Sequence, residues 1–334
     1  MKVIIIGTIP PPIGGVSIHI DRFLNLYKDN SKFELAVLDL KKKTLFIKNK
    51  KIKNIFKIIL SFLTSKIVHI HISNSYVKLL FTIIGKILFK KVIYTHHNII
   101  VRNRYVFKLM YQLCNKVILV NDKEIDRSLI NINKTKVIPA FLQPYKLDKL
   151  PSKLEDEMKS YNQIISTNCF FYNLIDGKHV YGFDLIVNAF YKLSQEAKIK
   201  DTLLILVDPS NTTKEFVTTL LKQKNFYTNK VLLQTEKLDF VSLVKKSNIT
   251  IRATRTDGDS LSIRESLYFN IPIICSDVIV RPKGVVLFNS DDSDDLSDKI
   301  LSTIKNKNNF KYEHIDYGKQ ILDLYNELTE IKNE

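Results

Sequence analysis

Cysteine is scarce in this sequence, and its few cysteines form no pattern. Of 334 residues only Cys114, Cys169 and Cys275 are cysteines, and they lie far apart without a CxxC or Cys/His arrangement. A disulfide framework and a structural zinc site both need closely patterned cysteines, so neither is expected. The three thiols suit a reducing cytosol.

Long hydrophobic runs are also missing. The longest candidates, Ile55–Leu63 and Leu79–Phe89, are both interrupted by lysines and fall short of the roughly 18 apolar residues that a membrane span needs. The first residues contain a run of only four apolar side chains, Val3–Ile6, and no small-residue cleavage site follows. A signal peptide is therefore not expected, and we expect a cytoplasmic protein.

Acidic residues are few in the first half of the chain. Residues 1–150 contain 27 Lys and Arg against 8 Asp and Glu, whereas residues 151–334 contain 24 against 26, for a net charge of +17. Such asymmetry suits a domain that faces a polyanion, either nucleic acid or anionic lipid. The alternative is a solvated face coated with lysine. We find no basic, aromatic-studded recognition motif, so nucleic acid is not an expected partner.

Short β-branched runs alternate with helical patterns in both halves. The alternation predicts an α/β fold with parallel sheets covered by helices. Strands are expected at residues 2–7, 34–40, 67–72, 92–96, 117–121, 136–139, 163–167, 202–207, 230–234, 249–252, 272–275 and 285–288. Helices are expected at residues 16–27, 56–63, 77–89, 101–113, 183–195, 213–224, 240–246, 260–269, 293–304 and 317–331.

This pattern predicts two Rossmann-like, doubly wound domains that face a central cleft. We expect an N-terminal domain at residues 1–145, a C-terminal domain at 160–312, and a last helical segment at 313–334 that packs back toward the N-terminal domain. Residues 142–162, with Pro144 and Pro151, are interpreted as the linker. Residues 41–53 are expected to form a loop that leads into a basic amphipathic helix. Ligands of such sheets bind beyond the carboxyl ends of the strands, so the motifs that follow strands matter most.

A double-glycine loop follows the first predicted strand. Gly14 and Gly15 come just before a predicted helix, in the run Gly7-Thr-Ile-Pro-Pro-Pro-Ile-Gly-Gly-Val-Ser17. Paired glycines let backbone N–H groups approach an anion at a helix N-terminus. The alternative is a tight turn without a ligand. The run is not GxGxxG, and no suitable acidic residue follows, so a nicotinamide dehydrogenase is poorly supported.

Four of the seven histidines lie at the carboxyl ends of two predicted strands. These are His69 and His71 on one strand, and His96 and His97 at the end of the next. No accompanying ligand set supports a metal site. We favour polar contacts to a sugar or a phosphate, with a structural role as the alternative.

An arginine-rich acidic loop follows a strand of the second half. It runs from Arg252 through Arg255, Asp257 and Ser260 to Glu265, and a helix begins near Ser260, a plausible N-cap. Arginines and a helix N-terminus suit a diphosphate, and carboxylates suit sugar hydroxyls. A surface network of ion pairs is the alternative.

These motifs resemble those of the retaining GT-B glycosyltransferases, notably glycosyltransferase family 4. Asp257 and Glu265 have seven residues between them, as do the two acids of that family. Further matches lie along the chain, at Tyr181-Gly-Phe-Asp-Leu-Ile, at Asn270-Ile-Pro-Ile-Ile-Cys-Ser-Asp277, at Lys136-Val-Ile-Pro139, in the double-glycine loop and at His97. The resemblance thus covers nearly the whole chain and implies the GT-B fold.

In the second half, the resemblance implies a site for the donor. Glu265 would bind the ribose hydroxyls of a nucleotide, and Asp257 would contact the donor sugar. The backbone amides of Ser260, Leu261 and Ser262 would touch phosphate or sugar. The expected donor is a nucleoside-diphosphate sugar, with UDP as the nucleotide part.

In the first half, the resemblance implies the reacting centre. Gly14 and Gly15 would approach the donor diphosphate, and His97 would line the reacting centre. Together with Asp257 and Glu265, His97 completes the candidate catalytic set, and His71 and His96 are the candidates on the acceptor side.

The sequence departs from the family pattern at the diphosphate. The first acid, usually Glu, is Asp257, and the usual Arg and Lys after the first strand of the second domain are missing from residues 168–172. Because an uncompensated diphosphate would be costly, we expect Arg252, Arg255 or Arg264 to replace them.

Two acidic clusters, Asp257–Asp259 and Asp291–Asp295, look like DxD metal signatures. The first is better explained by the donor loop. The second precedes a predicted helix, where acids favour the dipole and Ser293 is the expected cap. We therefore expect no metal requirement and no cofactor apart from the donor.

The expected function is a transfer of a sugar to a hydroxyl of a polyprenyl-diphosphate-linked glycan in surface polysaccharide synthesis, with retention of configuration. The acceptor would be held by the basic N-terminal domain, peripherally on the inner face of the cell membrane. A helix with an apolar stripe supports this, at Ile52, Ile55, Phe56, Ile59, Phe62 and Leu63, with Lys51, Lys53, Lys57 and Lys66 around it. The alternative is ordinary packing on the sheet. Other functions that stay open are a GT-B-shaped sugar-nucleotide epimerase and a catalytically inactive relative that only binds the donor.

Overall fold

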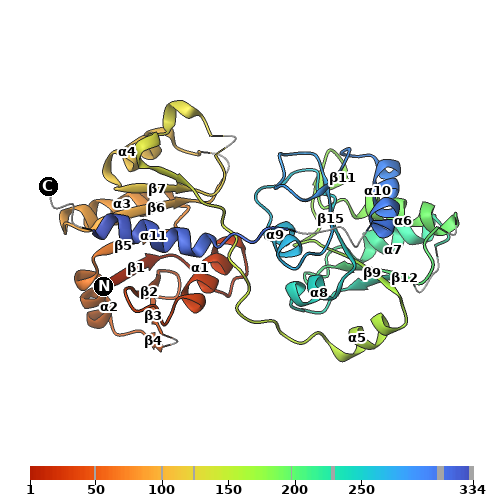
Figure 1. Cartoon of the computed structure of the whole chain (residues 1–334), viewed down its shortest axis with the longest axis horizontal. Helices are drawn as coiled ribbons and strands as arrows, with labels where there is room; N and C mark the ends of the chain where they lie inside the picture. Colours follow the sequence, from red (N-terminus) through yellow and green to blue (C-terminus); the bar gives the residue numbers. More distant parts are fainter. Residues whose placement is uncertain are drawn as a thin grey trace. The chain divides into compact units, whose positions relative to one another are not determined.

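The chain folds into two compact units. The computed structural model describes residues 1–48, 50–98, 101–122, 125–196, 198–226, 230–306 and 312–330. One unit comprises Met1–Tyr145 with Ile315–Glu334, and the other comprises Lys146–His314. Both contain a mostly parallel sheet covered by helices (Figure 1). The predicted α/β class with two Rossmann-like domains is confirmed.

The N-terminal unit contains an eight-stranded sheet in the order β4-β3-β2-β1-β5-β6-β7-β8. The inner strands are apolar and buried because helices cover both faces. The strands are β1 (Lys2–Ile6), β2 (Glu34–Asp39), β3 (Thr44–Ile47), β4 (Lys50–Ile52), β5 (Ile67–Ile70), β6 (Lys91–His96), β7 (Lys116–Leu119) and β8 (Thr135–Val137). The helices are α1 (Gly15–Leu26), α2 (Ile55–Thr64), α3 (Ser75–Ile87), α4 (Arg104–Leu113) and α11 (Tyr317–Thr329), with short 3-10 turns at Arg127–Leu129 and Ile132–Lys134.

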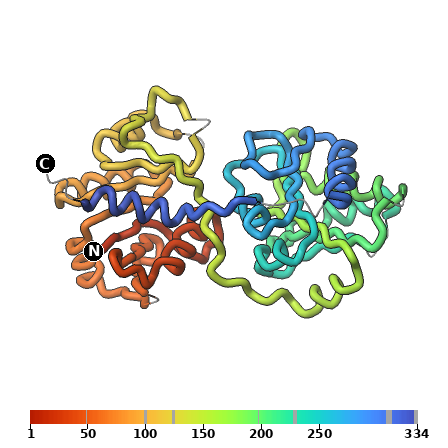
Figure 2. The backbone as a smooth tube through the Cα atoms, viewed as in Figure 1, coloured from red at the N-terminus to blue at the C-terminus, as the bar shows by residue number. Residues whose placement is uncertain are grey.

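The last helix, α11, belongs to the N-terminal unit, although it comes from the far end of the chain. Figure 2 shows it as the dark blue segment among the red and orange elements of that unit. Its Tyr325 is fully buried, with its ring 5.6 Å from that of Phe33 and 6.1 Å from that of Phe23. Burial of these aromatic rings fixes α11 on the unit.

The C-terminal unit contains a six-stranded parallel sheet in the order β13-β12-β9-β14-β15-β16. The strands are β9 (Gln163–Asn168), β12 (Thr202–Val207), β13 (Val231–Gln234), β14 (Ile249–Arg252), β15 (Ile273–Ser276) and β16 (Val286–Phe288), with a small hairpin of β10 (Leu174–Ile175) and β11 (Lys178–His179). The helices are α5 (Ser152–Lys159), α6 (Phe183–Gln195), α7 (Lys214–Gln223), α8 (Phe240–Lys246), α9 (Leu261–Tyr268) and α10 (Ser293–Lys305).

Each sheet has one point where the strand order reverses. In the N-terminal unit it lies between β1 and β5, and in the C-terminal unit between β9 and β14. Open parallel sheets bind ligands beyond the carboxyl ends of the strands at this switch point. The double-glycine loop follows β1, and the arginine-rich loop follows β14, so both predicted motifs lie at switch points.

One local prediction was wrong, and another, whose range does contain the boundary between the units at Tyr145–Lys146, was incomplete. Residues 41–53 are not a loop, because β3 pairs antiparallel with β2, and β4 with β3, as a hairpin at the sheet edge. The exposed lysines Lys50 and Lys51 of β4 suit an edge strand, and they hid the short apolar run that buries Leu45 and Phe46 in β3. Residues 142–162 are not only a linker, because α5 lies within them and buries Leu154 and Met158, one turn apart, in the C-terminal unit.

Gly182 fixes the start of α6 against the loop after β14. Its φ is +66°, and a Cβ at this position would lie 2.0 Å from the carbonyl oxygen of Ala253. Only glycine allows this approach of the two backbones. None of the helices in the described parts of the chain is both long and apolar enough to span a membrane.

Candidate active site

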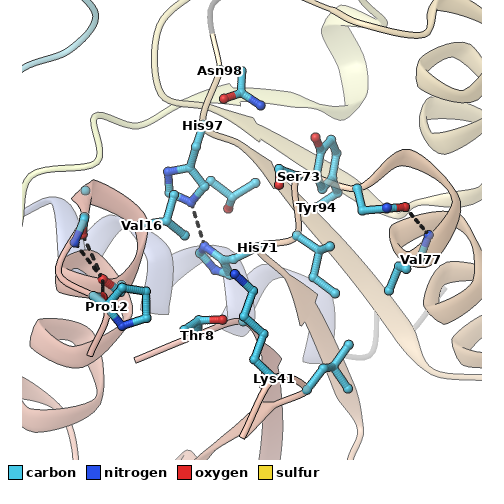
Figure 3. Close-up of a pocket in the computed structure, with 18 of the residues that line it drawn as sticks. Thr8, Pro12, Val16, Lys41, His71, Ser73, Val77, Tyr94, His97 and Asn98 are labelled. Atoms are coloured by element: carbon cyan, nitrogen blue, oxygen red, sulfur yellow. Dashed lines mark hydrogen bonds between the residues drawn. The ribbon is translucent and has the colours of Figure 1, made fainter. Parts of the chain in front are cut away.

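A cavity of about 460 Å³ opens at the switch point of the N-terminal unit. It lies beyond the carboxyl ends of β1, β5 and β6, and Figure 3 shows the side chains that line it. The lining comes from Gly7–Thr8, Pro12–Ser17, Leu40–Lys41, His71–Asn74, Val77, Tyr94–Thr95 and His97–Asn98. Three predicted site elements therefore meet in one cavity: the double-glycine loop, His71 and His97.

The double-glycine loop presents the N-terminus of α1 to this cavity. Gly14 is the N-cap and Gly15 the first helical residue. A Cβ on Gly15 would meet no atom within 4 Å, and one on Gly14 only the hydroxyl of Ser17 at 3.9 Å. That hydroxyl accepts the N–H of Gly14 at 3.0 Å and lies 2.8 Å from the carbonyl oxygen of Pro12, which pins the loop. The first amides of a helix lack intrahelical partners, so this end can bind an anion.

His71 and His97 form a hydrogen-bonded pair beside the glycines. His71 Nδ1 lies 2.8 Å from His97 Nε2, so one ring donates and the other accepts. Figure 3 shows both rings pointing into the cavity, with Val16 beside His97. Burial is the largest cause that lowers the pKa of each well below its usual value. Both imidazoles are thus neutral at pH 7 and suit hydrogen bonding or proton acceptance rather than charge neutralisation.

Two further histidines support this pair from behind. His19 of α1 donates from Nδ1 to the carbonyl oxygen of Ala140 at 2.7 Å, and its ring lies 5.3 Å from that of His71. His69 bridges Thr95 Oγ1 at 2.7 Å and the hydroxyl of Tyr325 at 2.6 Å. Burial lowers the pKa of His19 to about 4 and that of His69 to about 3. The last helix of the chain thus contributes a hydrogen bond to the layer behind the cavity.

His96 does not join this group. Successive strand residues point to opposite faces, so the His96 ring lies against Phe107, at a ring distance of 5.0 Å, on the side away from His97. Its Nδ1 lies 2.8 Å from the hydroxyl of Tyr94. The two candidates for the acceptor side, His71 and His96, therefore line different hollows.

In the C-terminal unit, the Asp257 carboxylate accepts several hydrogen bonds within and around the loop after β14. It accepts two hydrogen bonds from Arg252 at 3.0 and 3.1 Å, one from Arg281 at 2.7 Å and one from Thr254 Oγ1 at 3.1 Å. It also accepts the N–H of Gly258 at 3.0 Å. The side chain is only 6% exposed. This arrangement fixes the loop, and a contact of Asp257 with a donor sugar stays a prediction.

The three arginines predicted to neutralise a diphosphate each have an aspartate partner. Arg252 pairs with Asp257, Arg255 makes a two-pronged bond to Asp184 at 2.8 and 2.9 Å, and Arg264 lies 2.7 Å from Asp259. These pairs resemble the ion-pair network that the sequence left open as an alternative. To bind a diphosphate, one of these arginines would have to bind it beside its aspartate or release the aspartate altogether.

The other predicted donor residues lie at the start of α9. Ser260 is the N-cap as predicted, but its hydroxyl lies 2.9 Å from that of Ser262 and does not cap the helix. Leu261 is the first helical residue, and Glu265 is buried one turn further along. In the second acidic cluster, Asp292 rather than Ser293 caps α10, because the Asp292 carboxylate accepts the backbone N–H groups of Asp294 and Asp295.

Some residues of the site were missed by sequence reasoning. Arg281 is buried against Asp257 and also donates to Ser276, and His19 and Tyr325 complete the histidine group. His19 could have been found from the sequence, because it lies four residues after Gly15 and so on the same face of the predicted helix. Arg281 and Tyr325 gave none, because their contacts depend on tertiary packing.

In the described parts of the chain, no group of three or more His, Cys, Asp and Glu is arranged to hold a metal ion. The DxD-like pair of Asp257 and Asp259 instead contacts arginines: Asp257 pairs with Arg252 and Arg281, and Asp259 pairs with Arg264.

Solved structures share this fold along the whole chain, whereas no family model and no curated protein sequence matches it. HepE of Anabaena in complex with UDP has a TM-score of 0.67 at 13% identity, covering 98% of this chain and 100% of that one. A glycosyltransferase from Rickettsia africae ESF-5 has a TM-score of 0.65 at 17% identity, covering 100% and 99%. Sucrose-phosphate synthase from Thermosynechococcus elongatus has a TM-score of 0.64 at 14% identity, covering 98% and 99%. The fold is therefore GT-B, as predicted.

Proposed function

We propose that the protein is a glycosyltransferase that uses a nucleoside-diphosphate sugar. The observation that carries the proposal is the cavity in which the glycine-rich N-terminus of α1 and the neutral His71–His97 pair meet at a switch point. Support comes from the GT-B fold, because HepE was crystallised with UDP and with UDP-glucose. A UDP-sugar is accordingly the donor that we propose.

In the reaction, the bond between the anomeric carbon and the diphosphate oxygen breaks, and a bond to an acceptor hydroxyl oxygen forms. Negative charge grows on the leaving diphosphate and is met by the N-terminal amides of α1 from Gly15 onward, because the N–H of Gly14 already donates to Ser17. Because its ring is neutral, His97 can hydrogen-bond a sugar hydroxyl without competing for the diphosphate. The acceptor proton leaves on the released phosphate oxygen. We propose that configuration is retained and that no metal takes part.

The donor site of the C-terminal unit would rest on the start of α9. Glu265 would bind ribose hydroxyls, and the amides at Ser260–Ser262 would bind phosphate or sugar. Asp257 would act by holding the loop that precedes them. This division gives Glu265 a direct role and Asp257 a positioning role.

The acceptor would come from an anionic membrane surface. On α2, the side chains of Ile55, Phe56 and Leu60 are 58%, 78% and 60% exposed, and Phe89 beyond α3 is 97% exposed. An apolar groove of about 640 Å³ lies between α2 and α3, with Lys43 and Lys53 in its lining. The apolar stripe of α2 is therefore mostly exposed rather than packed on the sheet. Exposed apolar side chains beside lysines suit an anionic bilayer, and we propose that the protein acts peripherally on the inner face of the cell membrane, on a polyprenyl-diphosphate-linked glycan.

A nucleotide-release assay tests the reaction. The protein is incubated with a panel of sugar nucleotides and membrane lipid extract, beside Glu265→Ala and the control Glu157→Ala, which changes an exposed side chain of α5. We expect acceptor-dependent release from one donor, lost in Glu265→Ala and kept in the control. Conversion of the donor without an acceptor would identify an epimerase instead. Nucleotide binding without release or conversion under any condition would identify an inactive relative.

Vesicle flotation tests the membrane surface. We expect the protein to float with vesicles containing phosphatidylglycerol and not with pure phosphatidylcholine. Phe56→Asp should abolish flotation, whereas Ile132→Asp, at a side chain that is 73% exposed on a 3-10 turn of the same unit, should not. Equal flotation of the two variants would contradict a surface centred on α2.

A further inference from the structure

An apolar groove of about 640 Å³ runs between α2 and α3 of the N-terminal unit. Sites for small molecules typically have volumes of about 300–1,000 Å³. Leu38, Ile58 and Phe62 are buried and form its floor, where the Phe62 ring lies 6.2 Å from that of Phe81 on α3. Exposed apolar side chains, such as that of Ile59, form its walls. We call it the α2–α3 groove.

The groove has lysines at one end only. Because β3 pairs antiparallel with both β2 and β4, β2 and β4 end at the same edge of the sheet. Lys43 follows β2 and Lys53 follows β4, so both lie at this carboxyl edge. Leu63 and Leu88 lie at the opposite edge, because they are close to the points where α2 and α3 lead into the next strands. From Ile55 to Leu63 the apolar wall follows α2 for about 12 Å.

The two lysines of the groove lack an acidic partner. Within the described part of the chain no carboxylate lines the groove, and neither Lys43 nor Lys53 forms an ion pair with another described residue. From Lys41 to Asn121 the sequence contains 17 Lys and Arg and no Asp or Glu. The groove thus offers positive charge at the end of a long apolar surface. Its complement is an amphiphile with an anionic head and an apolar chain.

The lysine end of the groove adjoins the candidate active site. Leu40 lines both the groove and the cavity of the double-glycine loop, and Lys41 lines that cavity. An anionic head beside Lys43 and Lys53 would therefore lie next to the cavity, at the edge of the sheet that also carries the histidine pair. A sugar joined directly to such a head would extend into the cavity.

We propose that the α2–α3 groove binds the lipid chain of the acceptor, and that Lys43 and Lys53 bind the phosphoryl group at the head of that chain. The assignment of the lipid to the acceptor rests on the proposed function, whereas the binding of a single-chain lipid phosphate does not. Because the groove and the cavity share Leu40, the sugar that receives the transfer would lie close to this phosphoryl group.

This site is distinct from the bilayer contact proposed for α2. Phe56 and Leu60, whose exposed side chains would enter the bilayer, do not line the groove. Phe81 and Ile84, which do line it, are half-buried. A change in one set of residues should therefore affect one kind of binding and spare the other, so the two proposals can be tested separately.

Isothermal titration calorimetry with farnesyl phosphate tests the groove in the full chain. The lipid is kept below its micelle concentration, at constant ionic strength. We expect saturable binding of one molecule per chain with a negative heat-capacity change, which marks the burial of apolar surface. Farnesol, which lacks the phosphate, should bind at least about tenfold more weakly. Uptake without saturation would overturn the groove, and equal affinities for the two lipids would overturn the role of the lysines.

Filling the groove separates it from the bilayer contact. Ile84→Trp enlarges a side chain of the lining, whereas the control Ile83→Trp changes its neighbour, which is 39% exposed and outside the lining. We expect Ile84→Trp to weaken farnesyl phosphate binding by about tenfold or more and to keep flotation with anionic vesicles. Phe56→Asp should show the converse. Equal affinities of the two tryptophan variants would overturn the proposal.

An exposed lysine provides a second variant that leaves the packing of α2 and α3 unchanged. Lys53→Gln should weaken the binding of farnesyl phosphate and not that of farnesol, because it removes a charge and no apolar wall. The control Lys57→Gln, at an exposed lysine of α2 outside the lining, should leave both affinities unchanged. An equal loss of farnesyl phosphate affinity in both variants would show a general effect of charge and overturn the role of Lys53.

Turnover and a phospholipid then identify the source of the lipid. If the acceptor occupies the groove, its KM should rise in Ile84→Trp without a matching change in kcat. Dihexanoyl phosphatidylglycerol, kept below its micelle concentration, should not displace farnesyl phosphate; full displacement would assign the groove to a bilayer lipid instead. If no donor is ever turned over but farnesyl phosphate still binds, the proposed function fails and the groove stands. If turnover is normal and farnesyl phosphate does not bind, only the groove fails.

Discussion

Replacement of Asp257 by asparagine would show whether this carboxylate acts on the sugar or on the fold. Asp257 receives two hydrogen bonds from Arg252 and one from Arg281, whose side chain is only 1% exposed. Asp257→Asn keeps the size of the side chain and removes its charge. The guanidinium groups of Arg252 and Arg281 would then face an uncharged amide, whose oxygen can accept a hydrogen bond but whose NH₂ group can only donate.

The size of the expected loss of stability follows from the ion pairs of Asp257 with Arg252 and Arg281. Burial alone would raise the pKa of Asp257, but Arg252 and Arg281 together hold it below its usual value, so the ionised form stabilises the fold. Removing one partner of a buried ion pair costs about 3–5 kcal/mol because the remaining charge stays buried. We expect the free energy of unfolding of the C-terminal unit to fall by that amount, while the N-terminal unit keeps its stability.

Hydrogen exchange of the intact chain, read out on its peptides by mass spectrometry, reports on the stability of each unit separately. Amides of β9 and β14 should exchange faster in Asp257→Asn by a factor corresponding to about 3–5 kcal/mol, and those of β1 and β5 should not change. The control Asp291→Asn removes a carboxylate that is 41% exposed and paired with Arg255 and Lys178, so less than about 1 kcal/mol is expected. If Asp257→Asn lost turnover but kept native protection at β14, the positioning role would be refuted and a direct contact with the sugar favoured.

Three further changes test other parts of the structure. Gly182→Ala should lower the free energy of unfolding of the C-terminal unit by about 2 kcal/mol or more, because it places a side chain on a left-handed residue and creates a steric clash. The control Gly177→Ala has a similar φ of +73° but no atom within 4 Å of its Cβ, so it should cost about 1 kcal/mol. Equal losses in thermal unfolding of the two variants would contradict the clash. Tyr325→Phe removes the hydroxyl 2.6 Å from His69 Nδ1 and should cost about 1–3 kcal/mol in urea unfolding; a neutral effect would show that α11 is held by packing alone. The pKa of His69 is about 3 in the folded chain and 6.5 for an ordinary imidazole, so the unfolded chain binds the proton first. Stability should therefore be complete above pH 6.5, and His69 alone should lower it by about 1 kcal/mol per pH unit below that value. The other buried histidines, whose pKa values are also lowered, add to this fall, and equal urea midpoints at pH 7.5 and 5 would contradict the prediction.

Much of the fold was predictable because the strands are buried on both faces. Runs such as Val3–Ile6 and Leu203–Val207 are continuous, apolar and flanked by helical patterns, so the predicted bounds of their strands differ little from the observed ones. The edge of the N-terminal sheet was not predictable in the same way. The hairpin of β3 and β4 carries lysines on its exposed side, and their density resembled that of a loop.

The candidate site was predictable where its residues are local to strand ends. Gly14, His71 and His97 follow β1, β5 and β6, and parallel strands end at the same edge of a sheet. The partners of the arginines could not be predicted, because Arg255 meets Asp184 across 71 residues of sequence. The contact of His69 with Tyr325 spans 256 residues and depends on where the last helix packs. Spacing along the chain carries no information on such contacts.

The two units compensate their positive charges in different ways, and this decides where an anionic ligand can bind. In the C-terminal unit Arg252, Arg255 and Arg264 each have an aspartate, so an incoming diphosphate would compete with a carboxylate already in place. In the N-terminal unit the buried ammonium groups of Lys78 and Lys90 are held by a phenol oxygen and by backbone carbonyl oxygens instead. Neutral acceptors leave the full positive charge uncompensated. An anion therefore gains more from the N-terminal unit, and its affinity there should fall as salt screens the exposed lysines while the buried pairs of the other unit change little.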